Sequence, residues 1–280
     1  MKIIMKIIKK TRFNFFMLTL TSFVLMSIWG CKDEETTPAP PADVTINVAQ
    51  QNMGLYSKIT ATWCGPCGSW GWDLNKEITE NVIENAIATS IYGSPSSKLT
   101  NETAQKLAVD FGVKGWPTFS FNGTNRTEYG ENGGIYTTVT QSNVTDAVSE
   151  FSNSPVEMGV GGNVSWDGNA FTLNWALKTF KDQSGNFKVG AYVLEDGVME
   201  IQSGKSGSVS HKHVLRDKIT DEIYGIDFSG NLSANSYTEL DAQTYDVDPS
   251  WNKDNIDVIG IIWKENSNGG YDFVNAARFN

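Results

Sequence analysis

Cysteine is scarce in this chain, with three residues in 280. This scarcity argues against a small scaffold held together by disulfides, and the high content of Gly and aromatic residues favours a larger β-structure with many turns. Two of the cysteines, Cys64 and Cys67, form a Cys-x-x-Cys pair, which is also half of a zinc site. A closed zinc site usually needs four ligands, and the only two histidines, His211 and His213, lie far downstream. We therefore expect no metal and no other cofactor.

Positive charge is also in short supply. The formal net charge is −10, and five basic residues fall within the first twelve positions, so the rest of the chain is more acidic still. An acidic chain repels phosphate backbones, and the sequence contains no basic patch that would attract them. The composition therefore argues against nucleic acid as a partner.

The N-terminus has the pattern of a secretory signal, with a basic segment over residues 1–12 and an apolar stretch over residues 13–30. An uncleaved membrane helix is the alternative, because the stretch is nearly long enough to span a bilayer. The run LMSIWGC at residues 25–31 resembles a bacterial lipobox, although Trp29 is unusual within it. The resemblance implies a lipoprotein signal peptide over residues 1–30 and a lipid on Cys31, which would anchor the chain to a membrane.

Residues 31–43 are acidic and then rich in Pro and Thr, so we expect a flexible tether between the lipid and the folded part. The acidic residues after Cys31 resemble the surface-export signal of some Gram-negative lipoproteins, or they are simply a solvated linker. We expect an outer-membrane lipoprotein of the bacterial cell envelope, on either the periplasmic or the surface-exposed face.

The Cys-x-x-Cys pair follows an alternating apolar run, residues 55–61, that predicts a strand. If a helix begins at Cys64, its sulfur lies over unpaired backbone N–H groups, which stabilise a thiolate relative to a thiol. We therefore expect Cys64 to attack disulfides and the more shielded Cys67 to resolve the mixed disulfide. The pair would alternate between a dithiol and a Cys64–Cys67 disulfide.

The pentapeptide WCGPC at residues 63–67 is the active-site signature of thioredoxins, and VKGWPTFSF at residues 113–121 resembles their second signature. The resemblance implies a thioredoxin-like α/β domain over residues 44–154 and a cis bond before Pro117. It also implies that Trp63, Trp116 and Pro117 bind an extended polypeptide substrate. The alternative for Pro117 is an ordinary proline in an edge strand.

Two positions depart from the thioredoxin pattern. Ser57 and Lys58 stand where thioredoxins carry an acid on the strand before the dithiol, and Gly68 replaces the usual basic residue after the second Cys. If Lys58 lies close to the pair, it would favour a thiolate electrostatically. The Gly-Pro dipeptide resembles that of reducing thioredoxins and favours the reductase direction.

Beyond Pro155, short alternating runs separated by Gly- and Asn-rich turns predict an all-β sandwich of immunoglobulin-like architecture over residues 155–280. The segments VGAYVLED (189–196) and HKHVLR (211–216) resemble the outer-membrane-protein-twenty-eight family. That family combines a thioredoxin-like domain with a C-terminal β-sandwich.

The two histidines allow more than one interpretation. His211 and His213 are either a two-ligand metal patch or partner contact, or a neutral pair bonded to loop backbone, and the role of Arg216 is equally open. Arg216 could hold a nearby acid such as Asp217 or Glu222.

Together these patterns predict a lipid-anchored, extracytoplasmic thiol-disulfide oxidoreductase. Its partners would be polypeptide disulfides or thiols and an unidentified thiol electron donor. The alternative is a non-enzymatic cell-surface binding or adhesion lipoprotein in which the cysteine pair is a structural disulfide.

Overall fold

The computed structural model describes residues 45–130 and 134–279. The predicted signal peptide, Cys31 and the tether lie outside these residues. Val44–Asn280 form one compact unit. Within the described residues, no helix is long and apolar enough to cross a membrane.

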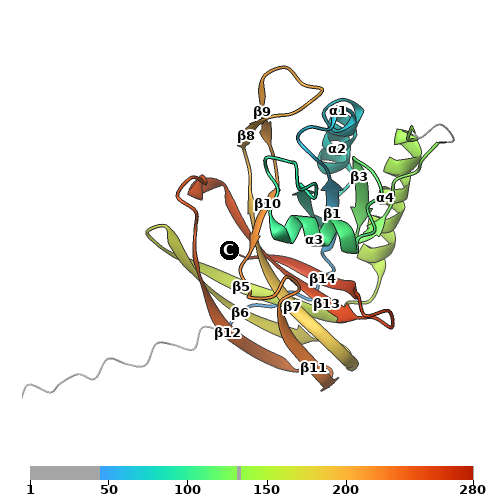
Figure 1. The fold of residues 1–280 in the computed structure, drawn as a ribbon. Coiled ribbons are helices and arrows are strands. Elements are labelled where there is room, and N and C mark those ends of the chain that lie inside the picture. Colours follow the sequence, from blue (N-terminus) through green and yellow to red (C-terminus); the bar gives the residue numbers. More distant parts are fainter. Residues whose placement is uncertain (1–44, 131–133, 280) are drawn as a thin grey trace, which may run out of the picture. The chain divides into compact units, whose positions relative to one another are not determined.

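The described residues form four α-helices, one short 3-10 helix and fourteen strands (Figure 1). The helices are α1 (Gly65–Gly68), α2 (Trp70–Asn81), α3 (Glu102–Asp110), α4 (Thr137–Asn153) and η1 (Lys253–Asn255). The first seven strands are β1 (Gly54–Ile59), β2 (Ala86–Ile91), β3 (Thr118–Phe121), β4 (Thr124–Asn125), β5 (Met158–Asp167), β6 (Ala170–Thr179) and β7 (Gln183–Glu195). The others are β8 (Val198–Ile201), β9 (Ser208–His211), β10 (Val214–Lys218), β11 (Ile226–Leu232), β12 (Tyr237–Asp246), β13 (Ile256–Glu265) and β14 (Tyr271–Phe279).

The largest sheet has nine strands, in the order β14-β13-β7-β10-β2-β1-β3-β4, with β11 also paired to β7. The sheet is mixed. Strand β2 runs parallel to both β1 and β10, and all the other strand pairs of this sheet are antiparallel. A second sheet has the order β12-β6-β5, and β8 and β9 form a separate hairpin.

The prediction of a thioredoxin-like α/β domain followed by an immunoglobulin-like sandwich is wrong as a fold class. The described residues form a β-rich fold with mixed sheets and no separate α/β core. The two predicted domains are not separate because β10, from the second half of the chain, pairs with the outer edge of β2. Ser90 N–H donates to the carbonyl oxygen of His213 at 2.6 Å, and Val214 is fully buried at this junction. An edge strand has unpaired backbone groups, and the pairing at Ser90 and Val214 joins this edge to a strand from the second half of the chain.

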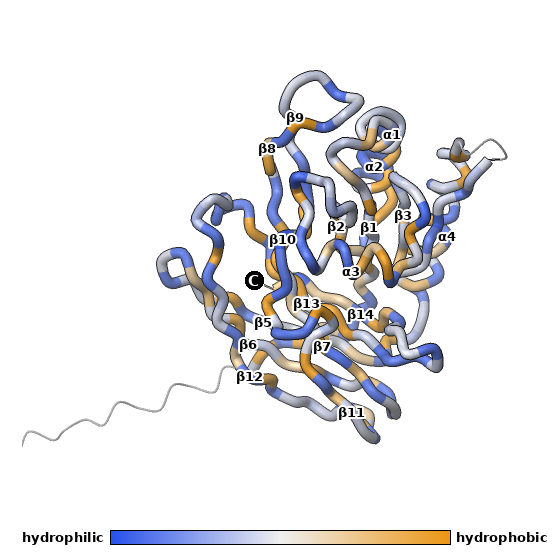
Figure 2. Tube along the Cα trace, viewed as in Figure 1, coloured by the Kyte–Doolittle hydropathy of each residue, from blue (hydrophilic) through white to orange (hydrophobic). Residues whose placement is uncertain are grey.

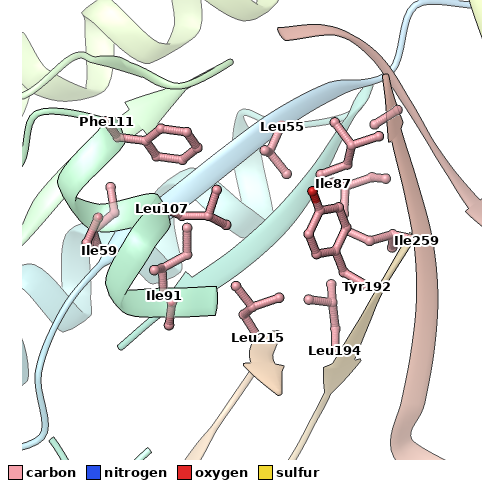
Figure 3. Packing of buried hydrophobic residues seen from close by; sticks show 14 of the residues in the cluster. Leu55, Ile59, Ile87, Ile91, Leu107, Phe111, Tyr192, Leu194, Leu215 and Ile259 are labelled. Atoms are coloured by element: carbon pink, nitrogen blue, oxygen red, sulfur yellow. The ribbon is translucent and has the colours of Figure 1, made fainter. Parts of the chain in front are cut away.

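The apolar core follows the sheets and not the two halves of the sequence. One buried cluster packs α3 and strands β1 and β2 against β7, β10 and β13 (Figure 3). That cluster joins Leu107 and Phe111 with Tyr192, Leu194 and further apolar residues from distant segments. A second cluster fills the space between β5 and β6 on one side and β7 and β13 on the other. A third lies under α2 and α4. Burial of these apolar surfaces is the main stabilising term for the unit.

Candidate functional site

The cysteine pair lies where β1 leads into α1. Cys64 is the N-cap residue of α1, and Pro66 occupies its first turn, where a missing N–H costs nothing. Cys64 and Cys67 form a disulfide, with their Cα atoms 5.2 Å apart. The Cys67 N–H donates to Cys64 Sγ at 3.1 Å. Such a donor stabilises negative charge on this sulfur when the pair is reduced. The expected helix start is confirmed, although α1 is only one turn long and is separated from α2 at Ser69.

The second predicted segment lies against this pair. The Trp116–Pro117 bond is cis, and the Trp116 carbonyl oxygen is 3.6 Å from Cys64 Sγ. Pro117 packs against Gly71 of α2, where an added Cβ would be 2.6 Å from Pro117 Cγ. The structure therefore brings Cys64, Cys67, Trp116 and Pro117 together.

Trp63 differs from these residues. Its side chain is 51% exposed, and its indole N–H donates to Ser94 Oγ at 3.1 Å. It thus lies at the outer side of the site, half exposed, with its indole N–H held by one hydrogen bond.

Both sulfur-bearing residues are buried, which differs from the expectation that Cys64 is open to substrate. Cys64 is 3% exposed and Cys67 is 1% exposed. The tip of the β8–β9 hairpin packs on the turn that carries them, and we call residues 202–204 the covering loop. In Figure 1 this hairpin lies beside α1 and α2, and Figure 2 shows its tip in mostly pale colours with a short hydrophilic stretch.

Hydrogen bonds to the backbone hold the covering loop in place. Ser203 N–H donates to the carbonyl oxygen of Thr62 at 2.8 Å. The Gln202 side-chain amide donates to the carbonyl oxygens of Cys64 at 2.9 Å and Ala61 at 3.2 Å. Gln202 itself is 1% exposed. Sequence reasoning missed Gln202, because no local pattern links it to a residue 138 positions away.

Gly68 explains how the loop can approach so closely. A Cβ at this position would lie 2.0 Å from the carbonyl oxygen of Ser203 and 2.9 Å from Gln202 Cγ. In the sequence, the glycine at position 68 in place of the usual basic residue was the one indication that another segment packs closely on the Cys64–Cys67 turn.

We expect Gly68→Ala to lower the free energy of unfolding by about 1–3 kcal/mol, because the added methyl group overlaps backbone of the covering loop. Urea denaturation measures the change. Gly115→Ala is the matched control, since a Cβ there meets nothing within 4 Å and should change stability by less than about 0.5 kcal/mol. Equal losses in the two variants would contradict the packing argument.

Lys58, on β1, is buried with its side chain toward α2. It is 4% exposed, and Nζ lies 4.9 Å from the centre of the Trp72 ring. Burial, and to a smaller extent the positive charge of Lys205, lowers the pKa of Lys58 to about 8. Lys205 lies 5.5 Å from the same ring and 3.6 Å from Asp73 Oδ1.

The two histidines have different surroundings. His211 is 1% exposed, and its Nε2–H donates to the Glu200 carbonyl oxygen at 3.2 Å while Nδ1 accepts from Tyr92 Oη. Burial lowers the pKa of His211 to about 4, so the ring is neutral. His213 lies 3.0 Å from Asp196 Oδ1. Among the residues that the structure describes, no group of three or more His, Cys, Asp or Glu is placed to hold a metal ion.

Arg216 has a partner other than those the sequence suggested. Its Nε lies 3.3 Å from Glu195 Oε2, and its guanidinium lies 4.6 Å from the centre of the Trp251 ring. Asp217 instead accepts a hydrogen bond from Tyr245 Oη at 3.0 Å. Arg216 thus belongs to the packing of the second half of the chain and not to the cysteine site.

Comparison with known proteins supplies a fold but no family. No family model and no curated protein matches the chain. Among solved structures, HBP35 of Porphyromonas gingivalis is similar, with a TM-score of 0.65 and 18% identity, covering 83% of this chain and 76% of that one. The E. coli curli protein CsgC aligns with a TM-score of 0.22 and 12% identity, over 42% of this chain and 94% of that one. The first likeness shows a shared fold alone, and the second supports no argument. The resemblance to the outer-membrane-protein-twenty-eight family stays a prediction.

Proposed function

We propose that this chain is an extracytoplasmic thiol-disulfide oxidoreductase, anchored by a lipid on Cys31 in the bacterial outer membrane. The observation that carries the proposal is the Cys64–Cys67 pair itself, joined as a disulfide at a helix start. Cys64 Sγ there accepts the Cys67 N–H and lies beside the Trp116 carbonyl oxygen. The hydrogen bond favours a thiolate on Cys64, and the carbonyl offers an acceptor to a polypeptide bound across Pro117.

The reaction proceeds in two exchanges. The Cys64 thiolate attacks one sulfur of a substrate disulfide, which forms a mixed disulfide and releases one substrate thiolate. The Cys67 thiolate then attacks Cys64 Sγ, which releases the second substrate thiolate and forms the Cys64–Cys67 disulfide. The substrate gains two electrons and, after protonation, two thiols. An external thiol donor returns the pair to its reduced form by the reverse exchanges. No metal or organic cofactor takes part.

Because both cysteines are buried and the covering loop is bonded to the backbone around them, we infer that this loop moves before a substrate disulfide reaches Cys64. Three hydrogen bonds from Gln202 and Ser203 hold that loop, and each contributes only about 1 kcal/mol against water. Opening of this hairpin tip is therefore compatible with exchange on an enzymatic timescale.

The same burial favours a second candidate function. A buried Cys64–Cys67 disulfide under a hydrogen-bonded loop is also what a structural bridge requires, as in a non-enzymatic surface binding or adhesion lipoprotein. Exposed apolar side chains on the hairpin, Met199 at 62% and Ile201 at 57%, would be available to a partner in that case.

Redox titration distinguishes the two functions. If the chain is an oxidoreductase, equilibration with dithiothreitol buffers should give a potential for the Cys64–Cys67 pair between about −120 and −270 mV, the range of exchange enzymes. Quenching with a maleimide reagent and mass spectrometry measures the reduced fraction, in a Cys31→Ser background that leaves two thiols. A potential well below about −300 mV would identify a structural bridge and reject the enzymatic proposal.

A further inference from the structure

A cavity of about 310 Å³ lies between α2 and the end of β9, with its floor formed by β1 and β2. It is separate from the cysteine pair, since neither Cys64 nor Cys67 lines it. Its size is that of a pocket for a small molecule and is too small for a macromolecule. The charged and aromatic residues that matter for the argument are Lys58, Trp72, Lys76, Glu80, His211 and Lys212.

Lys58 lies at the floor of this cavity without a counter-charge. In the described part of the chain, no carboxylate lies within 4.0 Å of its Nζ and no hydrogen bond from it is found. Trp72 provides only a cation–π contact at 4.9 Å. The residue is 4% exposed and lines the cavity, so its ammonium has lost much of its hydration without gaining a charged partner, whereas buried charges in proteins are usually paired. This arrangement points to a partner that is not part of the chain.

The other cavity residues give the site a positive balance. Lys58, Lys76 and Lys212 line the cavity, against the single carboxylate of Glu80. This is an unusual surplus in a chain whose formal charge is −10. His211 does not compete for an anion or for the Lys58 protons, since both its ring nitrogens are engaged by Tyr92 Oη and the Glu200 carbonyl oxygen.

We propose that this cavity binds a small organic anion, whose carboxylate or phosphate group pairs with Lys58 Nζ. Lys76 and Lys212 attract the anion at the mouth, and Glu80 opposes it. The lowered pKa of Lys58, near 8, still leaves the amine mostly protonated at neutral pH, and a bound anion would raise it again. This binding does not require disulfide exchange at Cys64 and Cys67, so each of the two proposals can fail without the other.

Calorimetric titration of the full chain with benzoate and with phenyl phosphate tests the proposal at pH 7 and low salt. The two probes carry the same ring, so the difference between them identifies the head group that the cavity prefers. We expect the preferred probe to bind wild type, and Lys58→Met to weaken its affinity by about tenfold or more because the buried charge is lost. The matched control is Lys114→Met, which removes an exposed lysine outside the cavity and should leave affinity within about twofold.

Glu80→Gln gives a second test, in which the affinity for the anion should rise and not fall. Glu80 is exposed at the rim, so the variant should fold as wild type does, and removing its charge should tighten binding by about twofold to fivefold. Two results would overturn the proposal: neither probe binding wild type below about 10 mM, or Lys58→Met binding as tightly as wild type. Circular dichroism of Lys58→Met checks that a lost affinity does not reflect a lost fold.

Discussion

Cys64→Ser is expected to abolish disulfide exchange, with the rate of reduction of a test disulfide falling by roughly a thousandfold or more. A serine hydroxyl is not ionised near neutral pH and cannot form the mixed disulfide on which the reaction depends. Cys64→Ser and Cys67→Ser both lose the Cys64–Cys67 disulfide, so a difference in activity between these two variants reports chemistry and not stability. The measurement is the turnover of a disulfide-linked peptide with dithiothreitol as donor, in the Cys31→Ser background.

Cys67→Ser should behave differently from its partner. Cys64 would still attack, but the mixed disulfide could not be resolved within the protein, so it should accumulate as a covalent adduct of protein and peptide that mass spectrometry detects. Gln202→Ala is the companion variant, because it removes the two side-chain hydrogen bonds from the covering loop to Ala61 and Cys64 and should speed alkylation of reduced Cys64. If Cys64→Ser and Cys67→Ser reduced the peptide as fast as wild type, Cys64 would not be the nucleophile.

Local structure around the cysteine pair was predictable because it depends on neighbours in sequence. The alternating run at residues 55–61 and the apolar run at 86–92 predict strands, and β1 and β2 confirm both. The apolar spacing of residues 104, 107, 108 and 111 predicts a helix with Thr100 as its N-cap. The helix is confirmed as α3, but its N-cap is Asn101, whose side chain accepts the Ala104 N–H at 2.8 Å. Propensity and capping rules place such elements to within a residue or two.

Pairing between distant segments was not predictable in the same way. The alternation of His211 and His213 indicates a strand there, but it does not show that β10 lies beside β2 and continues the sheet across both halves of the chain. The same limit applies to the site. Cys64, Cys67, Trp116 and Pro117 follow from recognisable local motifs, whereas the covering loop comes from a hairpin with no chemical signature.

Asn275 is a polar residue in an apolar strand, and its side chain joins this strand to backbone groups of two distant segments. It is 1% exposed in β14, in the segment YDFVNAARF. Its Oδ1 accepts the Met53 N–H at 2.9 Å, and its Nδ2 donates to the carbonyl oxygens of Gln51 at 3.0 Å and Met158 at 2.7 Å. One side chain thus binds backbone groups from the segment before β1 and from the start of β5.

Asn275→Ala should therefore lower the free energy of unfolding by about 3 kcal/mol or more. The change leaves the Met53 N–H without its partner and two carbonyl oxygens with one partner fewer, and each buried polar group left unsatisfied costs about 1–3 kcal/mol. Urea denaturation measures the loss. Hydrogen exchange at the Met53 amide should accelerate beyond the global change, because its acceptor is the atom removed.

Asn174→Ala is the matched control for this substitution. Asn174 lies on β6 with an exposed side chain, so the same chemical change there should alter stability by less than about 0.5 kcal/mol. If Asn275→Ala cost no more than Asn174→Ala, its hydrogen bonds would be replaced by water at no penalty. The junction between β14, β5 and the segment before β1 would then depend on apolar packing alone.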